Sequence, residues 1–423
     1  MPWWMNQSGD AKPFIALRRW ASVAVQRLIR VGPEQPAGVN PPVNDLAPVT
    51  VQPVQPTPPS TPSAAPGTQA VLVFDADEAA APQLLPTLED SPSKARHASF
   101  NRQVFDFDGE RYGFNLYVPA QAAAADTLDA RLPLLVMLHG CQQDAPDFAR
   151  GTGMNELAAT TPFMVLYPEQ PAKANQMRCW NWFDTAHQGR SAGEPAMLAA
   201  LTRLIIARYP VDEARVYIAG LSAGGAMAAI VAAHYPELFA ALGVHSGLPT
   251  GAAKDVMSAF KAMRVGGQHR KLTGPQALEH RMPTIVFHGS ADTTVHPGNS
   301  QSIVQAATAA LTASGLALQH SEALLSPPSA DESLRQAKRS VYKGDDGRSF
   351  IEHWSIVGSS HAWAGGNPEG SYTDPEAPGA SAAMLAFFAA VSLKTMQPVK
   401  KNGLPKADRR NTGAAPGLHL KGN

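Results

Sequence analysis

The feature that most constrains this fold is a serine flanked by glycines, where an apolar stretch meets a stretch of small residues. Gly220-Leu221-Ser222-Ala223-Gly224 follows the apolar residues 216–219 and precedes the small-residue segment 225–231. The first stretch predicts a buried strand and the second a helix, joined by a turn too tight for larger flanking side chains. Such a turn exposes the serine hydroxyl beside the positive end of the helix. We therefore interpret Ser222 as a candidate nucleophile, with a purely structural turn as the alternative.

Length and composition restrict the other possibilities. The 423 residues are 44% hydrophobic, which suits one large globular domain, or two small ones, with flexible segments. The formal net charge of +0 indicates no basic face for nucleic acid, and no apolar run is long enough to span a bilayer. Two cysteines, Cys141 and Cys179, argue against a disulfide-rich scaffold and a zinc cluster, and leave two thiols or one bridge open.

The first 97 residues do not have the composition of a globular domain. They hold 16 of the 37 prolines, which predicts an extended, disordered spacer. Within them, residues 14–31 place apolar side chains on one helical face and mainly arginine and glutamine on the other. We interpret this segment as an anchor for a polymer or membrane surface, or alternatively as a docked helix or a poor signal sequence. Its four arginines argue against a cleavable secretory signal.

Residues 98–394 alternate between patterns typical of strands and patterns typical of helices. This alternation predicts the α/β class, with a doubly wound, mostly parallel sheet covered by helices on both sides. Residues 395–423 form a short basic stretch punctuated by glycine and proline, which predicts a disordered tail. The expected strands are 111–118, 132–138, 163–167, 216–219, 240–245, 284–288, 341–343 and 350–357, and the expected helices are 148–159, 194–209, 225–234, 300–314 and 382–391.

A serine nucleophile needs an imidazole that takes its proton and a carboxylate that orients the imidazole. In a doubly wound sheet, functional groups gather after the carboxyl ends of the strands. Asp292 follows the predicted strand 284–288 and is our candidate acid, with a turn-forming role as the alternative. The other acids weighed, Asp184 and Asp255, lie earlier in the chain or on less ordered stretches.

His361 is the candidate base because it lies in a glycine-rich loop directly after a predicted strand. A histidine in a loop can swing onto the serine, whereas one inside a strand cannot. His288 and His296 flank Asp292 and are candidates for the layer of residues around the catalytic groups. The resulting chain order of Ser222, Asp292 and His361 is the order found in the α/β-hydrolases.

An oxyanion hole needs two backbone N–H groups aimed at the oxygen that becomes negative. One should come from Ala223, the residue after the nucleophile. The other should come from the loop after an early strand, which here is residues 139–143, and Cys141 is the best donor by position. The alternative for this loop is an ordinary turn at the end of a strand.

Three tryptophans lie close in sequence to these candidates. Trp180 and Trp182 follow Cys179, and Trp363 follows His361 by two positions. We assign all three to substrate binding as walls of an acyl or aromatic pocket. For Trp180 and Trp182, a place in the hydrophobic core is an equally good interpretation.

At these residues the sequence resembles the esterase/poly(3-hydroxybutyrate) depolymerase family, which is related to feruloyl and acetylxylan esterases. The resemblance covers about residues 110–392 and rests on five separate blocks in the family's order. The blocks are Leu138-His139-Gly140-Cys141-Gln142-Gln143, Cys179-Trp180-Asn181-Trp182-Phe183, the segment 215–227 around Ser222, the segment 288–295 around Asp292, and His361-Ala362-Trp363-Ala364-Gly365-Gly366.

The resemblance implies an α/β-hydrolase fold and a serine carboxylesterase that works through an acyl-enzyme without a cofactor or metal. It implies Ser222, Asp292 and His361 as the triad, Ala223 and Cys141 as oxyanion donors, and a bridge from Cys141 to Cys179. The expected substrate is a poly(3-hydroxybutyrate)-type polyester or its oligomers, with feruloyl or acetyl esters on polysaccharide as the alternative. A hypothesis of another class is a protein that anchors to a polymer granule or membrane surface, with secondary esterase activity.

The family resemblance also bears on localisation. It implies an extracellular or periplasmic protein, while the N-terminus carries no clear cleavable signal peptide and leaves a cytoplasmic location open. A bridge between the two cysteines would favour an oxidising compartment. The sequence does not indicate an oligomeric state.

Overall fold

The computed structural model describes residues 97–123, 131–269, 282–327 and 334–393. The predicted helix at residues 14–31, the predicted spacer up to residue 96 and the predicted tail at 395–423 lie outside these residues. The described ranges contain the whole set of candidate site residues. Their architecture is therefore the part of the chain that bears on the site.

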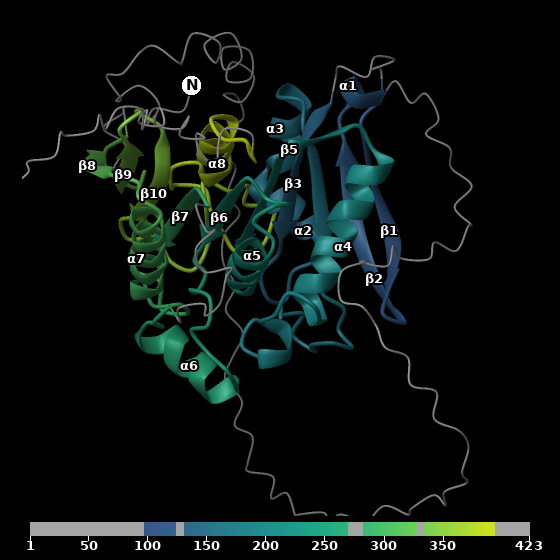
Figure 1. Cartoon of the computed structure of the whole chain (residues 1–423), viewed down its shortest axis with the longest axis horizontal. Helices are drawn as coiled ribbons and strands as arrows, with labels where there is room; N and C mark the ends of the chain where they lie inside the picture. Colours follow the sequence, from purple (N-terminus) through teal and green to yellow (C-terminus); the bar gives the residue numbers. More distant parts are fainter. Residues whose placement is uncertain (1–96, 124–130, 270–281, 328–333, 394–423) are drawn as a thin grey trace, which may run out of the picture. The chain divides into compact units, whose positions relative to one another are not determined.

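A ten-stranded sheet forms the centre of the described structure (Figure 1). Its strand order is β1-β2-β4-β3-β5-β6-β7-β10-β9-β8, and β11 pairs with β12 in a separate two-stranded ribbon. The strands are β1 (Ser99–Phe107), β2 (Glu110–Val118), β3 (Leu132–Leu138), β4 (Met164–Pro168), β5 (Val211–Leu221), β6 (Ala241–His245), β7 (Thr284–Gly289), β8 (Leu318–Leu325), β9 (Ala337–Gly344), β10 (Ser349–Ile356), β11 (Trp363–Ala364) and β12 (Thr373–Asp374).

The middle of the sheet is parallel and its outer strands are antiparallel. Strands β4, β3, β5, β6, β7 and β10 pair in parallel, whereas β1, β2, β8 and β9 join through antiparallel ladders. The parallel register sets Gly220 opposite Leu138 and sets Gly289 opposite Ile356. The carboxyl ends of these strands therefore meet at one edge, and the predicted mostly parallel sheet is confirmed.

Helices cover both faces of the sheet. Along β5, Val216 and Ile218 lie in the core with α4, α5 and α7, whereas Tyr217 and Ala219 lie in the core with α2, α3 and α8. This alternation follows from the two-residue period of a strand buried on both faces. The helices are α1 (Ala120–Ala123), α2 (Ala145–Thr152), α3 (Met154–Thr160), the 3-10 turn η4 (Thr185–His187), α4 (Gly193–Arg208), α5 (Ala223–His234), α6 (Val256–Val265), α7 (Gly298–Ala313) and α8 (Ala380–Ala389).

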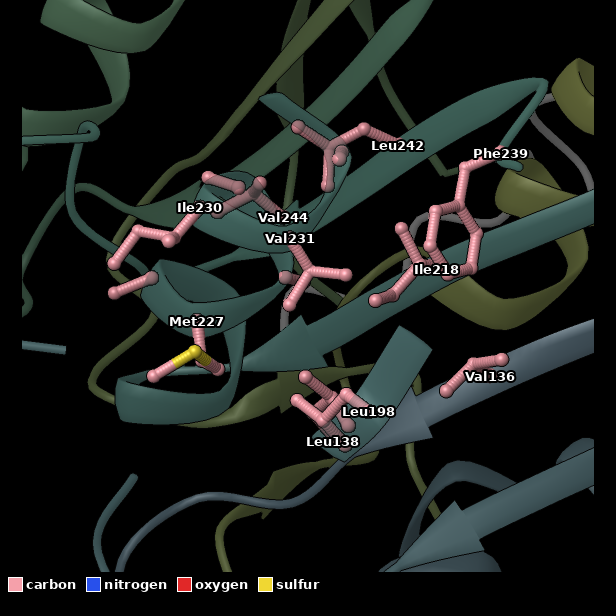
Figure 2. Packing of buried hydrophobic residues seen from close by; sticks show 14 of the residues in the cluster. Val136, Leu138, Leu198, Ile218, Met227, Ile230, Val231, Phe239, Leu242 and Val244 are labelled. Atoms are coloured by element: carbon pink, nitrogen blue, oxygen red, sulfur yellow. The ribbon is translucent and has the colours of Figure 1, made fainter. Parts of the chain in front are cut away.

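Helix α5 begins directly after the serine and lies against the centre of the sheet. Its residues are small or apolar on every side, a composition that suits a helix enclosed by other elements. Figure 2 shows Met227, Ile230 and Val231 of this helix among Ile218 of β5 and Val244 of β6. Close packing here fixes the helix end that adjoins Ser222.

The structure differs from the sequence prediction in several elements. The single helix expected at 148–159 is two helices, α2 and α3, because Gly153 adopts a left-handed φ of 61° between them. Strands β1 and β8 were not predicted; they are the outermost strands and most of their side chains are solvent-accessible. Helix α6 was not predicted either, although Asp255 and Ser258 form a capping box at its start.

The described helices are too short for a membrane span. Such a span needs about 20 apolar residues. The two longest described helices, α4 and α7, have 16 residues each. None of the helices in the described ranges is both long enough and apolar enough to cross a bilayer.

Ile218 provides a test of this packing, because its side chain is 0% exposed between the sheet and α5. Ile218→Ala should lower the free energy of unfolding by about 2–5 kcal/mol, since it leaves a cavity, whereas Ile218→Val should cost only about 0.5–1.5 kcal/mol. Urea or thermal unfolding of the purified chains measures both values. Equal stability of the three proteins would contradict the described core.

Candidate active site

Ser222 occupies a constrained turn between β5 and α5. Its backbone has φ 57° and ψ −119°, a conformation that costs energy for a residue with a side chain. The turn is held on both sides, because the Ser222 amide donates to the His245 carbonyl at 2.9 Å and the Ala226 amide donates to the Ser222 carbonyl at 3.0 Å. The strand–turn–helix predicted for this serine is therefore present.

The glycine at position 224 allows two backbones to approach closely. A Cβ at this position would lie 2.2 Å from the Leu138 carbonyl oxygen and 2.4 Å from that of His139. Only a glycine leaves room for this contact. The contact brings the start of α5 against the end of β3, so the loops that carry Ala223 and Cys141 are neighbours.

The loop that carries Cys141 is held by a buried glutamine. Gln143 accepts a hydrogen bond from the Gly140 amide at 2.9 Å, and its own amide group donates to Asp147 at 3.2 Å and to the Ser371 carbonyl at 3.1 Å. Gln143 was not among the predicted site residues, because a polar residue in a loop gives no sequence signal of its burial. These hydrogen bonds fix the path of the chain at Cys141.

The Cys141 and Ala223 amides, predicted as oxyanion donors, lie on adjoining loops. Within the described ranges, neither the Cys141 amide nor the Ala223 amide donates to a protein acceptor. The neighbouring Gln142 amide, by contrast, donates to the Met177 carbonyl at 2.7 Å. Two N–H groups on adjoining loops are thus available to an oxygen that is not part of the chain.

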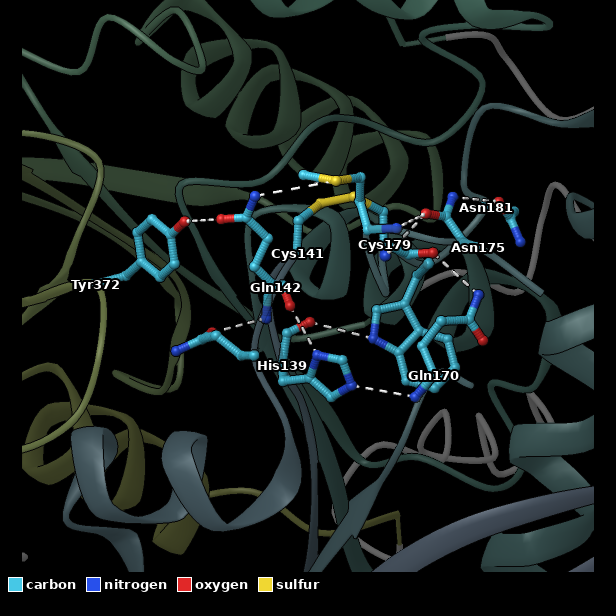
Figure 3. The surroundings of a disulfide bond; sticks show 12 residues. His139, Cys141, Gln142, Gln170, Asn175, Cys179, Asn181 and Tyr372 are labelled. Atoms are coloured by element: carbon cyan, nitrogen blue, oxygen red, sulfur yellow. Dashed lines mark hydrogen bonds between the residues drawn. A yellow bond between two sulfur atoms is a disulfide. The ribbon is translucent and has the colours of Figure 1, made fainter. Parts of the chain in front are cut away.

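A disulfide ties this loop to a second one. Cys141 and Cys179 are bonded, which confirms the bridge that the family resemblance implied (Figure 3). The Cys179 carbonyl accepts from the Gln170 side chain at 3.0 Å, and the Cys179 amide donates to Asn175 at 3.4 Å. The segment that carries Cys179 is therefore anchored at its backbone as well as through sulfur.

A buried glutamate supports the second loop from behind. Glu194, at the start of α4, accepts hydrogen bonds from Gln170 at 2.5 Å and from the amide and side chain of Asn181 at 2.8 and 2.7 Å. Burial raises the pKa of Glu194, and the charge interaction with His187 and these hydrogen bonds offset only part of the rise. Glu194 could not be recognised from the sequence, because acidic residues in a first helical turn are common.

The predicted acid and base are in direct contact. Nδ1 of His361 donates to Oδ2 of Asp292 at 2.7 Å, and the Asp292 side chain is 0% exposed. The other carboxylate oxygen, Oδ1, accepts from the amides of Thr294 at 2.9 Å and Val295 at 2.8 Å. Two residues 69 positions apart in the sequence are therefore joined as a carboxylate–imidazole pair.

The surroundings of Asp292 keep it ionised. Burial by itself would raise the pKa of Asp292, but hydrogen bonds from His288 and His361, the charge interaction with His361 and the Val295 amide outweigh that effect. The result is a pKa well below the ordinary value of an aspartate. Asp292 can orient His361 without taking its proton.

His245 connects the serine turn with the histidine loop. Its carbonyl accepts from the Ser222 amide at 2.9 Å, and its ring Nε2 accepts from the Ala364 amide at 2.9 Å. In the described structure, the hydroxyl of Ser222 makes no hydrogen bond with His361. The two side chains lie on segments that share one support, and their direct pairing remains a prediction.

The close approach of the acid and histidine loops also depends on one glycine. A Cβ at Gly289, the last residue of β7, would lie 2.3 Å from the Ser359 carbonyl oxygen and 2.4 Å from that of Ser360. The Ala291 amide donates to the same Ser359 carbonyl at 3.0 Å. The backbone after β7 and the backbone before His361 are therefore in contact.

The three tryptophans predicted to bind substrate lie in the core. Trp180, Trp182 and Trp363 are 0, 5 and 1% exposed. The indole N–H of Trp180 donates to the His139 carbonyl at 3.1 Å, and that of Trp363 donates to Ser381 at 3.0 Å. For Trp180 and Trp182 this fits the core interpretation that the sequence left open, and Trp363 likewise presents almost no ring surface to a substrate.

The competing acids and histidines have other roles. Asp184 caps η4 and Asp255 caps α6 through hydrogen bonds to backbone amides. His296 is solvent-accessible and accepts from the Gly298 amide at 3.0 Å, whereas His288 contacts Asp292 from within β7. Across the described ranges, no three side chains of His, Cys, Asp or Glu come together as a metal site would require.

Comparisons with known proteins show that this chain is similar to esterases. A family model described as esterase PHB depolymerase matches residues 112–319. Poly(3-hydroxyalkanoate) depolymerase C of Paucimonas lemoignei is 30% identical over 248 residues, which cover 55% of this chain and 56% of the relative. Feruloyl esterase B of Neurospora crassa is 32% identical over 195 residues, which cover 43% of this chain and 64% of the relative.

A third relative is covered more completely. Acetylxylan esterase A of Emericella nidulans is 30% identical over 217 residues, which cover 47% of this chain and 67% of the relative. The chain thus spans a little more than half of the depolymerase and somewhat less than two thirds of the feruloyl esterase.

The lowered pKa of Asp292 makes its contribution to stability depend on pH. Because the folded state favours the ionised form, the contribution is present above the ordinary aspartate value of 3.8 and is lost as the pH falls below it. The stability difference between the wild type and Asp292→Asn should therefore shrink between about pH 5 and about pH 3. Urea unfolding at a series of pH values measures it.

Asp184→Asn, which alters a solvent-accessible helix cap, is the matched control for this experiment. A difference between the wild type and Asp292→Asn that stays constant over the same range would show that Asp292 is not held as described.

Proposed function

The chain belongs to the esterase/PHB depolymerase family, and on that premise we propose that it is a serine hydrolase that cleaves carboxylic ester bonds. The observation that carries the proposal is the pair formed by His361 and the buried, ionised Asp292. This pair adjoins the constrained turn of Ser222 through His245. A nucleophile, its base and the group that orients the base thus lie at one edge of the sheet.

The first half of the proposed reaction forms an acyl-enzyme. Ser222 Oγ attacks the ester carbonyl carbon while Nε2 of His361 takes the hydroxyl proton, and the carbonyl electrons move onto oxygen. The amides of Ala223 and Cys141 donate to this oxyanion. Asp292 holds the proton-bearing Nδ1 and stabilises the imidazolium. The bond to the alcohol then breaks, and the alcohol leaves with the proton from His361.

The second half returns the enzyme to its starting state. A water molecule gives its proton to Nε2 of His361 and attacks the carbonyl carbon of the acyl-Ser222 ester. The same two amides donate to the second oxyanion. When the bond to Ser222 Oγ breaks, His361 returns the proton to the serine. The net reaction consumes one ester and one water and releases an acid and an alcohol.

We propose short-chain poly(3-hydroxyalkanoate) polyesters, or their oligomers, as the substrates. The support is the depolymerase relative, which aligns over 248 residues, compared with 195 for the feruloyl esterase and 217 for the acetylxylan esterase. Because the latter two are also 30% identical or more, feruloyl or acetyl esters of polysaccharides are the second candidate.

We further propose that the protein works in an oxidising compartment, outside the cell or in the periplasm. The support is the Cys141–Cys179 disulfide, because such bonds persist where thiols are not kept reduced. The bridge closes a loop between positions 38 apart. It adjoins the proposed oxyanion amide of Cys141, so an oxidising environment would keep that loop intact.

The role of Ser222 can be tested with p-nitrophenyl butyrate as a soluble probe ester. Ser222→Ala should lower kcat on the order of 10⁶-fold, because no acyl-enzyme can form. Ser258→Ala, which removes a hydroxyl from the cap of α6, should keep wild-type activity. Release of p-nitrophenol gives the rates, and equal activity of the wild type and Ser222→Ala would overturn the assignment of the nucleophile.

The substrate class can be tested by comparing esters under one set of conditions. The full chain should hydrolyse 3-hydroxybutyrate oligomers with a higher kcat/KM than methyl ferulate. It should also release more acid from poly(3-hydroxybutyrate) film than from acetylated xylan. Chromatography of the released acids measures each reaction, and Ser222→Ala supplies the blank. Faster release of ferulate or acetate would favour the polysaccharide esters instead.

A further inference from the structure

A buried histidine outside the proposed triad contacts the triad's acid. His288 lies near the end of β7 and is 1% exposed. Its ring nitrogen Nε2 is 2.8 Å from the Val295 carbonyl oxygen and 3.3 Å from Oδ2 of Asp292. His288 therefore contacts the same carboxylate oxygen that accepts from His361.

The contacts of His288 determine where its proton lies. A carbonyl oxygen can only accept a hydrogen bond, so Nε2 must carry the proton that points to Val295 and Asp292. The other ring nitrogen, Nδ1, is buried and has no partner in the described part of the chain. A second proton there would be a buried charge without a hydrogen bond, which is costly. Nε2 of His288 is thus a donor that is fixed in place.

We propose that His288 is a positioning residue that holds Oδ2 of Asp292 in place for His361. This role rests on the proposed function, since it acts through the proposed triad. Oδ1 of Asp292 accepts from the amides of Thr294 and Val295, and Oδ2 accepts from His361 at 2.7 Å and lies 3.3 Å from Nε2 of His288. These contacts restrict rotation of the Asp292 carboxylate, so Oδ2 stays directed at His361.

The donor from His288 also changes the electrostatics of the pair. A hydrogen bond to Oδ2 draws part of the carboxylate's negative charge toward His288 and away from His361. Without it, Oδ2 would hold the imidazolium form of His361 more tightly. Replacing His288 should therefore change the pH profile of the reaction.

The other ionisable groups near His288 do not counteract its effect on Asp292 and His361. His245 of β6 and His353 of β10 face this cluster. Burial lowers the pKa of His245 well below its ordinary value, and burial, with smaller contributions from neighbouring charges, lowers the pKa of His353 to about 4. The charges Lys338 and Glu322 act on His353 in opposite directions. Burial therefore disfavours the charged form of both histidines.

The test compares three replacements of His288 in the full chain, with p-nitrophenyl butyrate as the probe. Leucine has no hydrogen-bond donor, and the side chain of asparagine is too short to reach Asp292. The longer side chain of glutamine can place its amide N–H where Nε2 of His288 lies. His288→Leu and His288→Asn should lower kcat about tenfold, well short of the roughly 10⁴-fold loss that follows when a triad acid loses its function. KM should stay the same, and His288→Gln should restore most of kcat.

The pH profile separates positioning from a structural role. In His288→Leu and His288→Asn, the acid-side midpoint of kcat/KM should rise by about 0.5 pH unit, and in His288→Gln it should return toward the wild-type value. Thermal unfolding of each variant shows whether it is folded. If His288→Leu does not fold, His288→Asn takes its place in the comparison. A purely structural role would lower the unfolding temperature without moving this midpoint.

The outcomes also separate this inference from the proposed function. If Ser222→Ala retains the wild-type rate, the proposed function fails, and the positioning role fails with it. If Ser222→Ala is inactive but the folded His288 variants have the wild-type pH midpoint and kcat, only the positioning role is overturned. A raised midpoint that glutamine reverses supports the role of His288.

Discussion

The structure of the site depends on the close backbone contact between the start of α5 and the end of β3. At Gly224 no side chain fits, because the carbonyl oxygens of Leu138 and His139 occupy the place of a Cβ. This contact fixes the positive-φ turn of Ser222 and brings the two proposed oxyanion amides onto adjoining loops. The parallel register then carries Asp292 and His361 to the same edge.

Around this contact, buried polar side chains hold the loops that follow the strands. Gln143 holds the loop of Cys141, Glu194 holds the loop of Cys179, His245 joins the turn of Ser222 to the loop of His361, and His288 holds Asp292. Burying such groups is costly unless they are hydrogen-bonded, and each of these four side chains makes at least one hydrogen bond, although Nδ1 of His288 has no partner in the described part of the chain. Loops without regular structure thereby gain the fixed geometry that acyl transfer requires.

The central strands, the helices between them and the contact of Asp292 with His361 could be predicted from the sequence, because buried parallel strands leave continuous apolar runs and the strand ends must meet at one edge. Outer strands such as β8 were missed, since solvent-accessible strands lack this pattern. Gln143 and Glu194 were missed because their burial arises only from tertiary contacts. Trp363 was assigned to substrate binding although its ring lies in the core, whereas for Trp180 and Trp182 the core was an equally good interpretation from the start.

The central claim is that Ser222 takes the acyl group of the ester while His361, oriented by Asp292, takes the proton of the serine hydroxyl. The most direct measurement is mass spectrometry of peptides from enzyme that has been quenched in acid during turnover of p-nitrophenyl butyrate. The account predicts a butyryl group on the peptide that contains Ser222, and its loss in His361→Ala. A butyryl group on another residue, or full turnover by His361→Ala, would contradict it.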